Sequence, residues 1–111
     1  MRYSVSLKEN RDFRRLYSKG KSAAGSLLVI YCRKNGSVFN RIGYTVGTKL
    51  GKAVKRNRVR RRLRAIYRLN EASFARGYDI VVVARVKSRY ASYQELEAEF
   101  RSLSERVGLI V

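Results

Sequence analysis

The sequence has no histidine, no proline and no tryptophan, and its single cysteine is Cys32. Without histidine, the chain lacks the most frequent general base of enzymes and the most frequent protein ligand of zinc. One cysteine cannot form a disulfide within the chain, and without a histidine partner it is a poor nucleophile. Because Cys32 lies in an apolar run, we expect it to be a small buried side chain. We therefore expect no catalytic residue and no firmly bound metal in the protein.

Acidic residues are also scarce, and their distribution is uneven. The chain has 8 of them against 26 lysines and arginines, which gives a formal net charge of +18. None lies between Phe13 and Asn70. Apart from Glu9, Glu71 and the final predicted helix, only Asp12 and Asp79 remain, so the clustered carboxylates of a two-metal nuclease are missing. Segregated positive charge of this size indicates a nucleic-acid partner.

Long apolar runs are absent as well. No run approaches the length of a membrane span, and no apolar segment follows Met1. A chain of 111 residues is long enough to bury about two-thirds of its unfolded surface as one domain. We expect a single RNA-binding domain over residues 1–111, cytoplasmic and monomeric on its own, with no membrane partner.

The stretch from Lys52 to Arg68, KAVKRNRVRRRLRAIYR, combines helical periodicity with a dense series of cations. One helical face is marked by apolar residues at i, i+4, i+7 and i+8: Val59, Leu63, Ile66 and Tyr67. Like charges four residues apart repel each other, and no acidic residue relieves that repulsion here. Arginine predominates over lysine, and its planar fork suits bidentate contacts with phosphate. The expected partner of this face is therefore a polyanion.

Periodicity and cap residues predict the remaining elements. We expect a helix over 10–19 that stops at Gly20, with Asn10 as its N-cap or a capping box of Ser6 and Glu9 as the alternative. A last helix begins after Ser92, which forms a capping box with Glu95.

Strands are predicted over 27–32, 40–46 and 78–84. The dipeptide Asn35-Gly36 favours a hairpin between the first two. A whole helix separates 40–46 from 78–84, so these two should be parallel, with 78–84 central in the sheet. The order α-β-β-α-β-α predicts a small α+β fold with one sheet and helices packed on it.

Two aromatic residues of the first predicted helix could belong either to the core or to a ligand site. Phe13 and Tyr17 share a face with Leu16, and on spacing alone such residues belong to the core more often than to a ligand site. The alternative is that their rings face a bound nucleic acid, because aromatic side chains commonly stack on unpaired bases.

Longer stretches of the sequence resemble one family. GTKLGKAVKRNRVRRRLRAIYR, residues 47–68, is similar to the "RNR" helix region of the bacterial ribonuclease P protein subunit. LKENRDFRRLYSKGKS resembles the family's N-terminal helix and the turn after it. LVIYCRK and RIGYTVGTKLG match two of its strands, and GYDIVVVAR matches its later central strand. The similarity runs in the same order over nearly the whole chain.

This resemblance implies a function. Proteins of the family assist a catalytic RNA that removes the 5′ leader of precursor tRNA, so the chain would be the accessory subunit of a ribonucleoprotein endonuclease, a hydrolase of tRNA processing. In the family the RNA performs the hydrolysis, and Mg²⁺ is held mainly by the RNA. The implied fold includes a left-handed βαβ crossover, against the general right-handed rule.

The resemblance also implies two binding sites. Residues at family positions that face the catalytic RNA are Lys49, Lys52, Arg56, Asn57, Arg58, Arg61, Arg62, Arg64 and Arg68. Those at positions that face the leader of precursor tRNA, in a cleft between the first helix and the sheet, are Phe13, Tyr17 and Tyr31. The sequence departs from the pattern at Thr48, where many relatives carry a lysine, so one phosphate contact is expected to be absent.

Other classes of protein fit less well. A ribosomal or other structural RNA-binding protein would share the size, the charge and the arginine-rich helix, but it would not explain the position of the RNR stretch between these strands. A DNA-binding protein with a basic recognition helix would need a dimerisation element or base-reading residues, and no heptads follow the helix.

Overall fold

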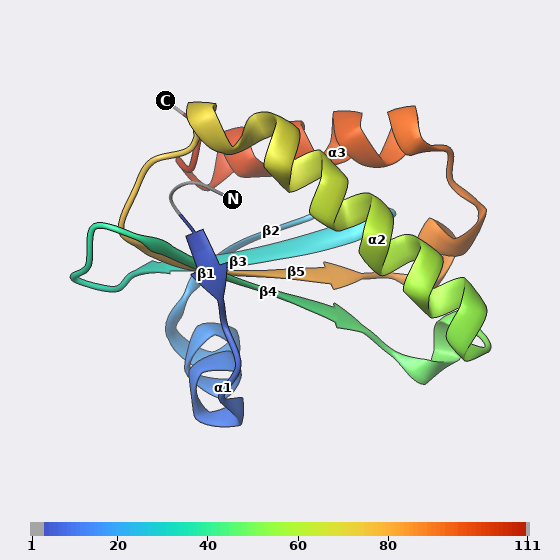
Figure 1. Cartoon of the computed structure of the whole chain (residues 1–111), viewed down its shortest axis with the longest axis horizontal. Helices are drawn as coiled ribbons and strands as arrows, with labels where there is room; N and C mark the ends of the chain where they lie inside the picture. Colours follow the sequence, from blue (N-terminus) through green and yellow to red (C-terminus); the bar gives the residue numbers. More distant parts are fainter. Residues whose placement is uncertain (1–3, 111) are drawn as a thin grey trace.

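The computed structural model describes residues 4–110, which form a five-stranded mixed sheet and three α-helices (Figure 1). In chain order the elements are β1 (Ser4–Ser6), α1 (Asn10–Lys19), β2 (Lys21–Ala24), β3 (Leu28–Lys34), β4 (Asn40–Val46), α2 (Ala53–Asn70), β5 (Tyr78–Ala84) and α3 (Tyr93–Arg106). Short 3₁₀ turns follow β4, α2 and β5: η1 (Thr48–Leu50), η2 (Glu71–Ser73) and η3 (Val86–Tyr90). The α+β class and all the predicted helices and strands are confirmed, and the short strands β1 and β2 are additional.

The strands lie in the order β1-β4-β5-β3-β2. β4 and β5 are parallel, as predicted, with Ile42 opposite Ile80. The predicted hairpin between β3 and β4 is wrong, because β5 lies between these two strands and pairs antiparallel with β3. The Asn35-Gly36 turn therefore begins a connection that passes over the end of β5.

The unit of β4, α2 and β5 is a crossover connection. In Figure 1 both strands run towards the right, and α2 lies above them. β1 is nearest the viewer, so the sheet order places β4 in front of β5. This arrangement is left-handed, an exception to the right-handed rule for parallel βαβ units.

Helices cover both faces of the sheet. α2 and α3 lie on one face and α1 lies on the other (Figure 1). β5 alternates accordingly: Ile80 and Val82 belong to the larger core with α2 and α3, whereas Val81 belongs to the smaller core with Leu16 of α1. The predicted burial of Cys32 in the larger core is confirmed, and desolvation raises the pKa of its thiol.

An ion-pair cluster holds α1 against the sheet. Arg41 of β4 donates from Nε and Nη2 to the two carboxylate oxygens of Asp79, at 2.7 and 2.5 Å. Its Nη1 lies 3.4 Å from Oδ2 of Asp12 in the first turn of α1. Both carboxylates are buried, so their charges depend on Arg41 for compensation. The cluster fixes the side of α1 that faces β4.

The helix ends agree only in part with the sequence prediction. Asn10 is the first residue of α1, and Glu9 occupies the N-cap position without a side-chain cap, so neither predicted cap is formed. The capping box of Ser92 and Glu95 at the start of α3 is confirmed. Within residues 4–110, no helix is long and apolar enough to cross a membrane.

Candidate nucleic-acid interface

One edge of the sheet is only partly covered. β1 pairs with β4 at Asn40–Ile42, and the N–H of Leu7 donates to the carbonyl of Ile42 at 2.9 Å. Beyond that point, no other described strand pairs with this edge of β4. The uncovered part of β4 lies between α1 on one face of the sheet and α2 on the other. This part of the edge, from Gly43 to Val46, is the floor of the candidate site.

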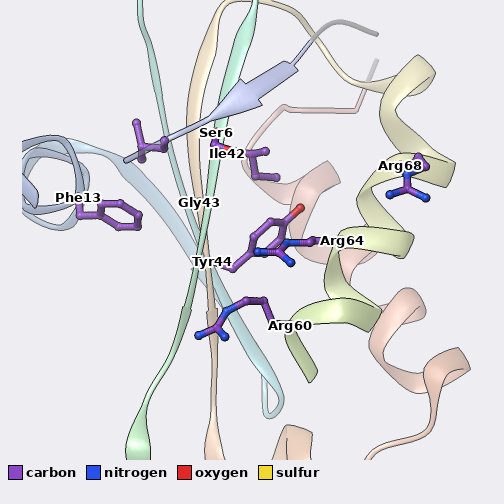
Figure 2. Close-up of a pocket in the computed structure, with 9 residues that line it drawn as sticks. Ser6, Phe13, Ile42, Gly43, Tyr44, Arg60, Arg64 and Arg68 are labelled. Atoms are coloured by element: carbon purple, nitrogen blue, oxygen red, sulfur yellow. The ribbon is translucent and has the colours of Figure 1, made fainter. Parts of the chain in front are cut away.

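A first cleft of about 230 Å³ opens on the α2 side of this edge (Figure 2). Phe13 of α1 and Tyr44 of β4 contribute aromatic walls. Three arginines of α2 also line the cleft, at intervals of four residues: Arg60, Arg64 and Arg68. Figure 2 shows Phe13 on one side of β4 and Tyr44, with the side chain of Arg64 near it, on the other. The cleft thus combines two aromatic rings with a row of cations.

A second, more open cleft of about 510 Å³ continues on the α1 side. Its lining residues are Asn10, Phe13, Arg14, Tyr17, Tyr44 and Thr45. Phe13 and Tyr44 line both clefts, so the two adjoin along the edge of β4. We call this continuous surface the β4-edge groove.

The three aromatic residues expected at a leader site lie together. Phe13 lines both clefts, and Tyr17 lines the second. Tyr31 packs edge-to-face against Tyr17, with ring centroids 5.0 Å apart. The hydroxyl of Tyr17 also forms a hydrogen bond of 2.8 Å with Oγ1 of Thr45, which fixes the ring although it is 41% exposed. Tyr31 lines neither of the two clefts and is linked to the groove by this contact with Tyr17.

Tyr44 is a groove residue that sequence reasoning missed. Strand alternation places it on the same face as the buried Ile42 and Val46, so the pattern indicates a core residue. In the structure it is half-buried and lines both clefts. Its hydroxyl is buried and has no hydrogen-bond partner among residues 4–110. Burial, with a smaller effect from Tyr67, raises the pKa of Tyr44 although Arg64 and Arg68 oppose the shift. The phenol therefore stays protonated at neutral pH.

The cations of α2 differ in how they are held. Exposed arginines that form no hydrogen bond or ion pair with any described residue are Arg58, Arg61, Arg64 and Arg68. Arg56 and Arg62 are half-buried and donate to backbone carbonyls, at 3.2 Å to Gly51 and 3.1 Å to Ala91. The remaining predicted residues, Lys49, Lys52 and Asn57, are exposed at the start of the helix. Unneutralised charge is thus concentrated on the outer face of α2 and on its flank towards the groove.

Several carboxylates of the sheet and helices are already engaged within the protein. Asp12 and Asp79 contact Arg41, as described above. Glu99 of α3 is far along the chain and accepts hydrogen bonds from the N–H groups of Leu27 and Leu28 at 2.7 and 2.6 Å. Among residues 4–110, no three His, Cys, Asp or Glu side chains gather as a metal site would require. The groove is therefore suited to binding an anion, and its own donor set does not fit a divalent metal ion.

The fold and this surface define a small basic protein of the nucleic-acid-binding class. The family model for Ribonuclease P matches residues 1–108, and the chain belongs to that family. The ribonuclease P protein component of Alkaliphilus oremlandii is 48% identical over 104 residues, which cover 94% of this chain and 91% of that protein. That of Alkaliphilus metalliredigens is 42% identical and covers 99% of both chains.

Solved structures show the same relationship. The RNase P protein of Staphylococcus aureus superposes with a TM-score of 0.88 at 28% identity, covering 96% of this chain and 97% of that one. The RNase P protein of Thermotoga maritima gives a TM-score of 0.84 at 33% identity, covering 93% and 97%. The resemblance noted in the sequence is thus confirmed for both the family and the fold.

Proposed function

We propose that this protein is the RNA-binding subunit of a ribonuclease P particle and assists removal of the 5′ leader from precursor tRNA in the cytoplasm. The observation that carries the proposal is the position of the aromatic β4-edge groove directly beside the arginine-covered face of α2. One surface is suited to unpaired bases and the other to a phosphate backbone. A protein that joins a single-stranded leader to a folded RNA needs both, side by side.

The leader would bind in the groove. Rings of Phe13 and Tyr17 are open to stacking with unpaired bases, and Tyr31 holds Tyr17 in place. Stacking on an aromatic ring contributes about 1–3 kcal/mol per base and depends little on base identity. The groove would therefore accept many leader sequences. Arg14 beside these rings supplies a cation for the leader backbone.

The catalytic RNA would bind the outer face and N-terminal end of α2. Its proposed contacts are Lys49, Lys52, Arg56, Asn57, Arg58, Arg61 and Arg62. The exposed arginines Arg58 and Arg61 have no protein partner within residues 4–110, so phosphate oxygens can approach both guanidinium groups. Such contacts release counterions, and binding should weaken steeply as salt increases.

Hydrolysis in this proposal belongs to the RNA subunit. Mg²⁺ held by that RNA would act as a Lewis acid that polarises the scissile phosphate, and it would activate the attacking water. The protein's contribution is to bind and orient the leader and to neutralise phosphate charge near the cleavage site. The buried carboxylates of Asp12 and Asp79 suit this division of work, because both are paired with Arg41.

A cleavage assay tests the proposal. Precursor tRNA labelled in its 5′ leader is incubated with bacterial ribonuclease P RNA at low Mg²⁺, with and without the protein. Protein-dependent release of the leader at the mature 5′ end, with no cleavage by the protein alone, is the expected result. If the folded protein binds RNA but does not stimulate cleavage, the proposal fails and a ribosomal or other structural role gains support.

A further inference from the structure

The arginines of α2 point in different directions. Residues four apart on an α-helix lie on the same side, so Arg60, Arg64 and Arg68 form one row. All three line the first cleft, together with Phe13 and Tyr44. The opposite flank faces α3, where Arg62 donates to the carbonyl of Ala91. Neither Arg58 nor Arg61 lines the cleft.

The arginine row is part of the groove. Its cleft shares Phe13 and Tyr44 with the aromatic cleft on the α1 side. A single strand whose bases stack near Phe13 and Tyr17 would bring its next phosphates along the β4 edge to this row. The cleft has a volume of about 230 Å³, which is far too small for a nucleic-acid duplex. Among the described residues, no acidic side chain lines it. Arg60 donates from Nη1 to Oδ1 of Asn57 at 3.1 Å and keeps its other N–H donors for phosphate. Arg64 and Arg68 are exposed, so their guanidinium groups are available to phosphate.

We propose that Arg60, Arg64 and Arg68 bind phosphates of the single-stranded leader, so that α2 contacts two RNAs on two different faces. The inference rests on the function proposed above and deepens it. It moves Arg64 and Arg68 from the catalytic-RNA site, where the family resemblance placed them, to the leader site. It also adds Arg60, which the resemblance did not assign. Tyr44 forms the wall that separates this row from the core of the sheet.

The row has a matched control in the same helix. Arg61 lies next to Arg60, is exposed like Arg64, and makes no hydrogen bond with described residues, but it is absent from the cleft. Arg64→Ala and Arg61→Ala therefore each remove one positive charge from α2, but from different faces of the helix. Arg68→Ala is a second variant of the row, also at an exposed position.

Two affinities are measured for each variant at several salt concentrations. The first is that of the protein for catalytic RNA alone. The second is the affinity of the reconstituted holoenzyme for precursor tRNA, compared with its affinity for mature tRNA. Arg64→Ala and Arg68→Ala should each lower the preference for precursor severalfold and reduce the salt slope of precursor binding by about one. Their affinity for catalytic RNA should stay within about twofold of the wild type, whereas Arg61→Ala should show the reverse pattern.

The outcomes separate this inference from the function on which it rests. If the wild-type protein confers no preference for precursor over mature tRNA, the proposed function fails. If it confers that preference but Arg64→Ala and Arg68→Ala both retain it, or if they weaken catalytic-RNA binding as Arg61→Ala does, the inference alone is overturned. Thermal unfolding of each variant confirms that the fold is retained.

Discussion

The ring of Phe13 lies directly against the main chain of Gly43. A Cβ added at residue 43 would be 2.5 Å from Cζ and 2.9 Å from Cε1 of this ring, closer than real contacts allow. The missing side chain lets the ring of α1 reach the edge of β4, where it lines both clefts. The β4-edge groove therefore depends on glycine at residue 43, because any side chain there would displace Phe13.

Gly43→Ala should displace Phe13 and disturb the groove. Because the ring packs on Leu7 and the small core beneath α1, we expect the free energy of unfolding to fall by about 1–3 kcal/mol, the usual cost of overpacking. Urea denaturation measures the change. Gly47→Ala is the control, because no atom lies within 4 Å of a Cβ there and its φ is −75°. Equal stability of both variants would contradict the packing described here.

Phe13→Ala should reduce the preference of the holoenzyme for precursor over mature tRNA while the affinity for catalytic RNA is retained. Loss of one stacked base costs about 1–3 kcal/mol. Because Phe13 is half-buried, Phe13→Leu is made beside it to keep apolar volume without the aromatic face. If Phe13→Leu keeps the full preference and Phe13→Ala merely unfolds, the ring serves the core and does not contact the leader.

Arg58→Ala and Arg62→Ala should have different consequences. Arg58 is exposed without a partner among the described residues, so its loss should weaken catalytic-RNA binding and lower the salt slope by about one, with stability unchanged. Arg62 donates to the carbonyl of Ala91 at the start of α3, so its loss should also lower the free energy of unfolding by about 1–2 kcal/mol. Salt-dependent binding and urea unfolding of both variants check this. Equal effects on stability would show that the Arg62 contact contributes nothing.

Tyr44→Phe should not destabilise the protein at neutral pH, because the hydroxyl that it removes is buried without a hydrogen-bond partner among residues 4–110. The folded pKa of Tyr44 is raised from its ordinary value of 10.0, mainly by burial. The linked stability is therefore fully present below pH 10.0 and is lost as pH rises towards the folded pKa. Above that pH the wild type should therefore lose stability relative to Tyr44→Phe, which has no phenol to ionise. Thermal unfolding of both proteins at neutral and alkaline pH measures this difference in stability. A difference that does not change with pH would show that the phenol of Tyr44 is not buried.

Local patterns predicted the long elements well. The bounds of α1, β4 and β5 agree with the residue ranges expected from periodicity, and the apolar stripe of α2 is buried as expected. β1 and β2 were missed because SVS and KSAA are short and carry no apolar alternation. These two strands form because they pair with β4 and β3, and a local sequence pattern does not encode such pairing.

The order of strands could not be predicted from the turn signal. Asn35-Gly36 correctly marks a chain reversal, and Gly36 has a φ of +75°. The same signal is compatible with a hairpin or with a longer connection around another strand. β5 is largely apolar apart from Asp79, and it takes the central position because it buries apolar side chains on both faces. The hydrophobic effect across the whole sheet thus overrides the local preference for a hairpin.

Only some of the residues that line the β4-edge groove could be predicted from the sequence. Phe13, Tyr17 and Tyr31 were identified through the family resemblance, since spacing alone favoured the core for the first two. Tyr44 was missed because strand alternation reports a face of the sheet but does not show that the strand is at an edge. The row of arginines facing the groove likewise depends on how α2 is oriented over β4, which the helical period alone does not determine.

Photo-crosslinking shows directly whether the leader lies in the β4-edge groove. Precursor tRNA with 4-thiouridine at single leader positions is bound to the reconstituted holoenzyme, irradiated, and the crosslinked peptides are identified by mass spectrometry. Crosslinks are expected to the segments around Phe13, Tyr44 and Arg64, and they should disappear when excess unlabelled precursor competes. Crosslinks confined to the outer face of α2 around Arg58 and Arg61, with none in the β4-edge groove, would contradict it.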